Sequence, residues 1–116
     1  MLYIISGKVI KGDGYGRKIG FPTVNLEVDE ALRQAQGKQF PRDGVYAGTA
    51  TMEGKIYRAG IVIGPNNRIE AHMIGYVGDA YGKEVTLEIN KFLREFKKFD
   101  TEEELIEQIK KDLNLV

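Results

Sequence analysis

The sequence predicts a fold dominated by β-structure, a closed antiparallel barrel followed by a C-terminal α-helix. Apolar, β-rich segments recur about every 8–12 residues with tight turns between them, which is typical of an antiparallel barrel. A long amphipathic helical pattern occurs only after residue 100. A chain of 116 residues is long enough for one domain with one core, and we expect a single domain over residues 1–116.

The expected extended segments are separated by turns rich in glycine, proline and asparagine. Glu53-Gly54 has the composition of a two-residue hairpin turn. Pro22 places the second segment at a sheet edge or in a turn, because proline donates no backbone hydrogen bond. In the last segment every second residue from Val85 to Ile89 is apolar, so these residues are expected on one face. The expected segments are Leu2–Ile10, Phe21–Val28, Val45–Met52, Ile56–Ile63, Ile69–Val77 and Glu84–Phe92.

Two helices are predicted. A short one spans Asp29 to Gln36, with Asp29 as a suitable N-cap and Gly37 as a suitable stop. The second begins after Thr101, which forms the pattern of a capping box with Glu104 three residues later. Apolar residues at helical spacing follow, with acids early and lysines late, as the helix dipole favours.

Composition argues against several classes of partner. Lys and Arg number 17, as do Asp and Glu, so the net charge is zero and no nucleic-acid partner is expected. No segment approaches the ~20 apolar residues of a membrane span, so no membrane partner is expected either. Cysteine is absent, which excludes disulfides and thiolate chemistry. Without a basic apolar leader as well, a cytoplasmic protein is expected, and we expect a monomer.

A glycine-rich stretch over residues 11–20 is a candidate phosphate-binding loop. Backbone N–H groups in such a loop can surround phosphate oxygens, and neighbouring cations add charge complementarity. It matches neither a Walker A motif nor a dinucleotide-binding fingerprint. A hairpin loop with solvated charges is the alternative interpretation. The residues concerned are Gly12, Gly14, Gly16 and Gly20, with Lys11, Arg17 and Lys18.

Thr23 and Asn25 directly follow this loop. Two residues apart in an extended segment, they point the same way. A hydroxyl and an amide oxygen are hard ligands, suited to Mg²⁺ shared with nucleotide phosphates. The alternative is a polar pair on the outside of an edge strand.

Glu70 and His72 share one face of the segment that begins at Ile69. A carboxylate that accepts a hydroxyl proton assists phosphoryl transfer to an alcohol, so Glu70 is a candidate general base. His72 is the only histidine, which excludes a site of several histidines, and we interpret it as a hydrogen-bonded structural residue.

Arg94, Phe96 and Phe99 lie between the last strand and the C-terminal helix. A guanidinium and aromatic rings can contact a planar ligand by cation–π or stacking interactions. Alternatively, the two phenylalanines fasten the helix to the barrel.

Together these motifs resemble the riboflavin kinase family, including the kinase module of bacterial bifunctional FAD synthetases. The resemblance spans the whole chain, and its most specific element is the Gly-Phe-Pro-Thr-x-Asn-Leu block. The matching motifs are Gly7–Val9, Gly12, Gly16–Leu26, Pro41–Ala47, Ile69–His72, Tyr81-Gly82, Leu93–Glu95 and Lys98-Phe99, followed by the helix.

The resemblance implies a six-stranded antiparallel Greek-key barrel with a C-terminal helix. It implies an enzyme that uses ATP and Mg²⁺ to phosphorylate riboflavin, giving FMN and ADP. The implied site residues are Gly12, Gly14, Gly16, Arg17 and Gly20 on the ATP phosphates, Thr23 and Asn25 on ATP and Mg²⁺, Glu70 as general base, and Arg94, Glu95 and Phe99 beside the flavin.

The chain departs from the family pattern at the turn from Gly64 to Arg68, which is short and lacks the usual Arg-Pro-Thr element. A non-catalytic flavin or nucleotide sensor on the same fold is therefore the alternative function. A CTP-dependent kinase and an oligonucleotide-binding barrel are further alternatives. No His-x-Gly-His motif occurs, so FAD synthesis by this chain is not expected.

Overall fold

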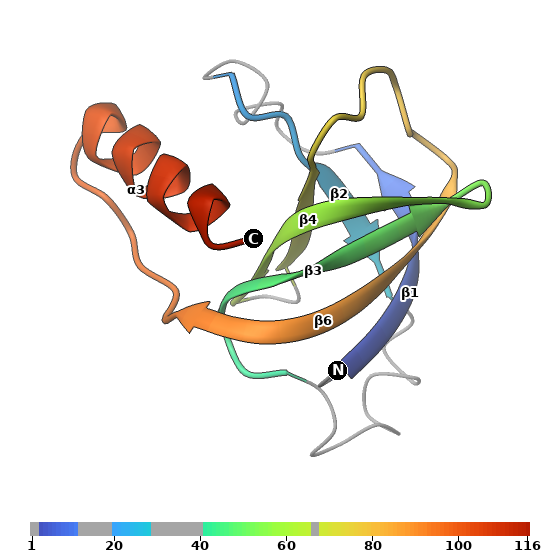
Figure 1. The fold of residues 1–116 in the computed structure, drawn as a ribbon, viewed down its shortest axis with the longest axis horizontal. Helices are drawn as coiled ribbons and strands as arrows, with labels where there is room; N and C mark the ends of the chain where they lie inside the picture. Colours follow the sequence, from blue (N-terminus) through green and yellow to red (C-terminus); the bar gives the residue numbers. More distant parts are fainter. Residues whose placement is uncertain (1–2, 12–19, 29–40, 66–67) are drawn as a thin grey trace.

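The computed structural model (Figure 1) describes residues 3–11, 20–28, 41–65 and 68–116. Its strands form a closed antiparallel barrel in the order β1-β2-β5-β4-β3-β6, and the helix α3 follows. The elements are β1 (Tyr3–Ile10), β2 (Val24–Glu27), β3 (Gly44–Met52), β4 (Lys55–Gly64), β5 (Arg68–Met73), β6 (Glu84–Arg94) and α3 (Glu102–Asn114).

This topology is a Greek key, because β3, β4 and β5 pair in succession and β6 returns to pair with β3. The predicted six-stranded barrel with a C-terminal helix is confirmed. The predicted short helix over residues 29–36 lies outside the described residues.

The barrel interior is filled by alternate residues of each strand. Val85, Leu87 and Ile89 of β6 have no exposed surface, as their alternation predicts. Ile61 and Ile63 of β4 meet them from the other side of the core and are at most 1% exposed. Burying each such side chain contributes roughly 1.5–3 kcal/mol, so the core fixes which residues face outward.

Two glycines allow strands to approach closely. A β-carbon at Gly7 would lie 2.7 Å from the carbonyl oxygen of Glu27, which explains why β1 continues through this glycine. A β-carbon at Gly48 would lie 2.0 Å from the carbonyl oxygen of Glu88. The register of the β3–β6 pairing shifts between Ala47 and Gly48, so this contact belongs to a bulge in the barrel wall.

The β3–β4 connection confirms the predicted hairpin turn. Glu53 and Gly54 both have positive φ, at 52° and 80°, as a type I′ turn requires. The turn brings Met52 opposite Lys55, and every residue of β3 is paired along β4.

The predicted extent of β5 is wrong at its C-terminal end. The strand ends at Met73 rather than Val77. Gly75 has a φ of 87°, and the amide of Tyr76 donates to the carbonyl of Met73 at 3.2 Å, so the chain turns there. The sequence shows no sign of this turn, because apolar residues continue after Met73 up to Val77.

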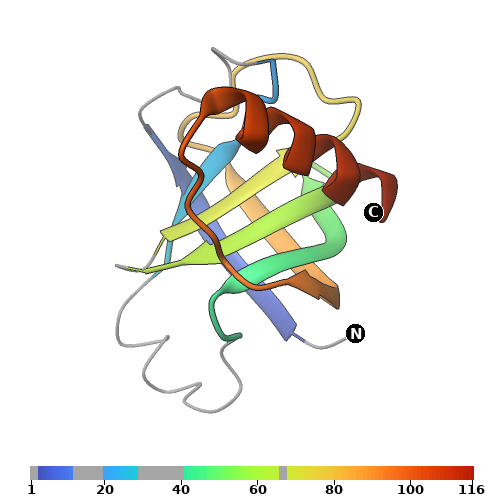
Figure 2. The same cartoon turned by 90° about the vertical axis from the view of Figure 1, so that its left-hand side faces the viewer.

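Helix α3 lies across the outer face of β4 and β5 (Figure 2). At its start the Thr101 hydroxyl accepts from the amide of Glu104 at 3.2 Å, which confirms the predicted N-cap. Its C-terminal end approaches the barrel at Gly60, where an added β-carbon would lie 3.3 Å from Leu113. Arg58 of β4 also donates to the carbonyl of Val116 at 3.2 Å.

Candidate active site

A cavity of about 600 Å³ lies between α3 and the outer face of the barrel. The barrel contributes residues that face outward from β4 and β5, and the segment joining β6 to α3 forms a second wall. Apolar side chains of the helix form the third wall, which explains why the apolar stripe of α3 is only half-buried. The residues of the three walls that matter most are Val62, Arg68, Glu70 and His72, then Phe96 and Phe99, then Leu105 and Ile109.

Glu70 forms the polar end of this cavity and is only 8% exposed. The Thr23 hydroxyl donates to its Oε1 at 3.3 Å, and Arg68 donates from Nε to its Oε2. Asn25 of β2 lies directly opposite Glu70 in the β2–β5 pairing, so both side chains are on the outer face. The structure therefore brings together the three predicted polar residues Thr23, Asn25 and Glu70.

His72 and Phe21 close the same end of the cavity. The imidazole Nδ1 lies 2.7 Å from the carbonyl oxygen of Pro22, and the ring meets Phe21 edge-on with centroids 6.1 Å apart. These contacts fit the structural role expected of His72. Phe21 was not singled out as a lining residue, although it precedes Thr23 by two positions in an extended segment.

Arg94 holds the helix. Its Nε lies 3.0 Å from Asp112 Oδ1 and its Nη2 lies 2.9 Å from Asp112 Oδ2. Asp112 is 7% exposed and also accepts from Gln108 at 3.0 Å. The sequence analysis missed this pair, although Asp112 follows Ile109 by three residues, which places a carboxylate on the apolar stripe of the helix.

Two of the three predicted flavin-contacting residues line the cavity, and one does not. Phe99 and Arg94 do, and the Arg94 guanidinium carbon lies 5.5 Å from the centre of the Phe99 ring. Glu95 is exposed and is not among the residues that line the cavity. Lys97 also contacts Phe99, with Nζ 5.4 Å from the ring centre.

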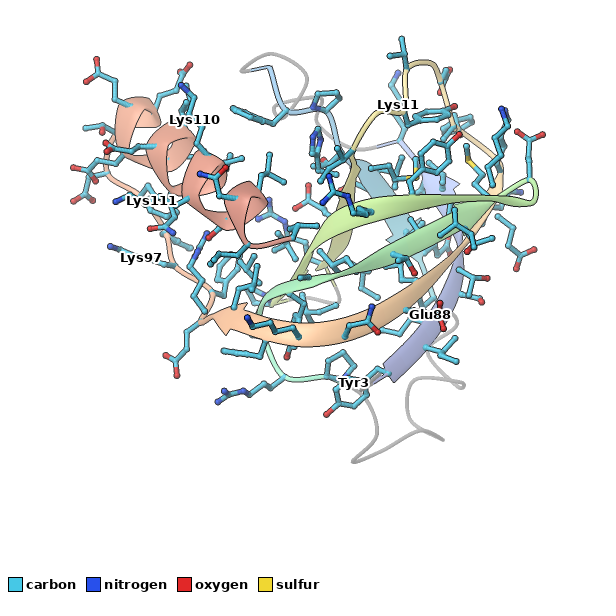
Figure 3. The ribbon with its side chains drawn as sticks, viewed as in Figure 1. Tyr3, Lys11, Glu88, Lys97, Lys110 and Lys111 are labelled. Carbon is cyan, nitrogen blue, oxygen red and sulfur yellow. The ribbon has the colours of Figure 1, made fainter. Side chains whose placement is uncertain are left out.

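Of the lysines near α3, Lys97 and Lys98 line the cavity, whereas Lys110 and Lys111 do not. Figure 3 shows Lys97, Lys110 and Lys111 on the side of the molecule that carries the helix, away from Tyr3 and Glu88. The lining of the site therefore combines aromatic and aliphatic side chains with several charged ones, among which Glu70 and Asp112 are the buried carboxylates. Such a lining suits a planar, largely apolar ligand that carries a hydroxyl-bearing tail.

The oxygen donors at the polar end are suited to Mg²⁺. The hydroxyl of Thr23 and the amide oxygen of Asn25, the two predicted ligands, come together beside Glu70. Across the part of the chain that the structure describes, no group of three or more His, Cys, Asp or Glu residues could hold a metal ion. These residues therefore fit a cation that takes most of its ligands from phosphates and water.

The predicted phosphate loop is described only at its end. Gly20 is exposed with a φ of 93°, and a β-carbon there would meet no atom within 4 Å. Gly12, Gly14, Gly16 and Arg17 lie outside the described residues. Among the helices described, none has both the length and the apolar character needed to cross a membrane.

A small closed barrel with an apolar cavity that ends at a buried carboxylate defines a class of ligand-binding barrels. The family model for riboflavin kinase, Flavokinase, matches residues 1–116. The chain therefore belongs to the riboflavin kinase family, and the predicted family is confirmed.

The relatives support the same assignment. The chain is 34% identical over 120 residues to the bifunctional riboflavin kinase/FMN adenylyltransferase of Bacillus subtilis (strain 168), covering 95% of this chain and 36% of that protein. It is 33% identical over 121 residues to the RNA-binding riboflavin kinase RibR of the same strain, covering 97% and 49%. The chain thus spans half or less of the length of these curated relatives.

Solved structures agree on the fold. A Streptococcus pneumoniae protein described as a macrolide-efflux protein superposes with a TM-score of 0.85 at 29% identity, covering 97% of this chain and 37% of that one. The riboflavin kinase of Trypanosoma brucei superposes with a TM-score of 0.73 at 22% identity, covering 97% and 72%. The second likeness bears on the fold alone.

Proposed function

We propose that this chain is an ATP-dependent riboflavin kinase, which transfers the γ-phosphoryl group of ATP to the ribityl 5′-hydroxyl and yields FMN and ADP. One observation carries the proposal: the apolar cavity under α3 ends at a buried carboxylate, Glu70, beside Thr23 and Asn25. Family membership supports the choice of substrates.

The acceptor would bind with its ring system between the helix and the aromatic segment. Phe99, Leu105 and Ile109 provide apolar surface for a flat ring, and Phe96 borders the route toward Glu70. Binding in this orientation directs the polar tail toward β5. Most of the rate acceleration would then come from positioning and from exclusion of water by the walls.

Glu70 would accept the proton of the acceptor hydroxyl as its oxygen attacks the γ-phosphorus and the bond to the β-phosphate oxygen breaks. A general base of this kind contributes roughly 10²–10⁴-fold to the rate. Thr23 and Asn25 would hold Mg²⁺ with the ATP phosphates, together with the loop of Gly12, Gly14, Gly16, Arg17 and Gly20. When bound, the cation neutralises the charge of the phosphates.

The test is FMN formation from riboflavin, ATP and Mg²⁺, separated by chromatography. The wild-type protein should form FMN, and Glu70→Gln should form it at least 10²-fold more slowly while still binding riboflavin. Equal rates for the two proteins would exclude Glu70 as the base. No FMN from the wild type would exclude the kinase.

A non-catalytic flavin sensor is the second candidate. It is favoured by the short turn from Gly64 to Arg68, which lacks the Arg-Pro-Thr element usual in the family and so leaves less chain to cover the substrates. Riboflavin or FMN bound tightly at equilibrium with no turnover would identify a sensor. Ordinary turnover would exclude it.

A further inference from the structure

Arg68 is the first residue of β5 and lies opposite Gly64 at the end of β4. Glu70 follows two residues later on the same face, and both side chains line the cavity. The Nε of Arg68 donates to Glu70 Oε2 and forms an ion pair with it. The pair therefore joins the start of β5 to the polar end of the site.

The two oxygens of Glu70 have unequal partners. Oε2 is held by the charged guanidinium, whereas among the described residues the partner of Oε1 is the neutral hydroxyl of Thr23, at a long 3.3 Å. Hydrogen bonds from charged donors are about twice as strong as neutral ones. Oε1 is consequently the oxygen that can exchange its partner for an incoming hydroxyl.

Burial makes this cation necessary. The Glu70 side chain is 11% exposed and that of Arg68 is 51% exposed, so the guanidinium reaches from the surface to a nearly buried carboxylate. A buried carboxylate without a paired cation is strongly unfavourable, and such a group turns toward water or takes another hydrogen-bond partner. Either response would remove the base from its position.

The surroundings fix the Arg68 side chain. A β-carbon at Gly64 would lie 3.2 Å from Arg68 Cδ and 3.3 Å from Phe96 Cε2, so the glycine leaves room for both side chains to pack together. The guanidinium carbon lies 5.8 Å from the centre of the Phe96 ring. Arg68 thus connects the aromatic wall of the cavity with the carboxylate.

We infer that Arg68 is a positioning residue for phosphoryl transfer: by holding Oε2 it presents Oε1 of Glu70 to the acceptor hydroxyl. The inference depends on the proposed kinase activity. Arg68 itself touches neither substrate in this role. During transfer the hydroxyl proton moves to Oε1, the new oxygen–phosphorus bond forms, and ADP leaves with the electrons of the broken bond.

The test compares Arg68→Gln and Arg68→Lys with a matched control. Lys83→Gln removes another surface ion pair, Lys83–Glu53 at 2.8 Å, which lies on the β3–β4 turn away from the cavity. Arg68→Gln should lower kcat about 10- to 100-fold, within the range of a general base, with KM for riboflavin and ATP changed less than about threefold. Arg68→Lys should recover part of the loss, and Lys83→Gln should match the wild type.

Gly64→Ala keeps the charge but crowds the Arg68 side chain, so it should lower kcat by a smaller factor. If Arg68→Gln does not fold, the kcat values of Gly64→Ala and Arg68→Lys test the inference instead. Wild-type kcat in all Arg68 and Gly64 variants would overturn the inference while leaving the kinase intact, and so would a rise in the KM for ATP with kcat unchanged. Absence of FMN from the wild type would instead refute the kinase, and the role of Arg68 with it.

Discussion

Arg94 can act in one of two ways, and its ion pair with Asp112 allows an experiment to tell them apart. As a flavin contact, Arg94 would act on the ligand directly, whereas in the structure it joins β6 to the last turn of α3. Arg94→Met, Asp112→Asn and the double variant together form a double-mutant cycle. If Arg94 acts by holding the helix, both single variants must weaken riboflavin binding, because each releases the same wall of the cavity.

The magnitude follows from the contacts. Three N–H···O contacts of 3.0, 3.2 and 2.9 Å join the two side chains. Removing one partner of a fully buried pair costs about 3–5 kcal/mol. The side chains here are 22% and 10% exposed, so solvent screens the pair. We therefore expect each single variant to lower the free energy of unfolding by about 2–3 kcal/mol.

Urea denaturation measures the stability, and quenching of riboflavin fluorescence measures the dissociation constant. The coupling energy should be about 1–3 kcal/mol, and the double variant should bind riboflavin no more weakly than either single one. Each single variant should raise Kd for riboflavin about tenfold, which corresponds to a loss of about 1.4 kcal/mol in binding free energy. An unchanged Kd in Asp112→Asn beside a raised Kd in Arg94→Met would refute the helix-holding role.

Three further predictions concern the proposed metal ligands, the barrel wall and the core. Thr23→Ala and Asn25→Ala should each raise KM for Mg·ATP about 10- to 100-fold with a near-wild-type melting temperature, and a large loss of stability would show a structural role instead. Gly48→Ala should lose about 1–3 kcal/mol in urea denaturation, because its β-carbon would lie 2.0 Å from the carbonyl oxygen of Glu88; wild-type stability would contradict the bulge geometry. Burial raises the pKa of Tyr46 above its ordinary 10.0, so the unfolded chain ionises first and wild-type stability should fall as the pH rises above 10.0. Tyr46→Phe should show a smaller fall over that range, and an equal fall would count against this assignment.

The strands were predictable because their signals are local. Alternation placed Val85 to Ile89 in the core, and Glu53-Gly54 marked a turn that needs positive φ at both residues. The end of β5 was not predictable, because apolar residues continue past Met73 and only the turn at Gly75 ends the pairing.

The roles of the candidate site residues stay predictions, and the sequence offered their residue types but not their pairing. Thr23, Asn25 and Glu70 could be chosen from their chemistry, and the barrel register then brings them together. The partner of Arg94 lies 18 residues away, on a helix whose placement on the barrel no local pattern reveals. Arg68 and Glu70 lie two residues apart on one face of β5, so their proximity follows from strand geometry, whereas the burial of Glu70 depends on what packs over that face.

The most direct measurement of the central claim is the structure of the protein with riboflavin and ADP bound, read at a single distance. The flavin ring should lie between α3 and the segment containing Phe99, with the ribityl 5′-oxygen about 2.6–3.2 Å from Glu70 Oε1. A flavin bound elsewhere, or a 5′-oxygen out of hydrogen-bonding reach of Glu70 with no water between them, would contradict the account.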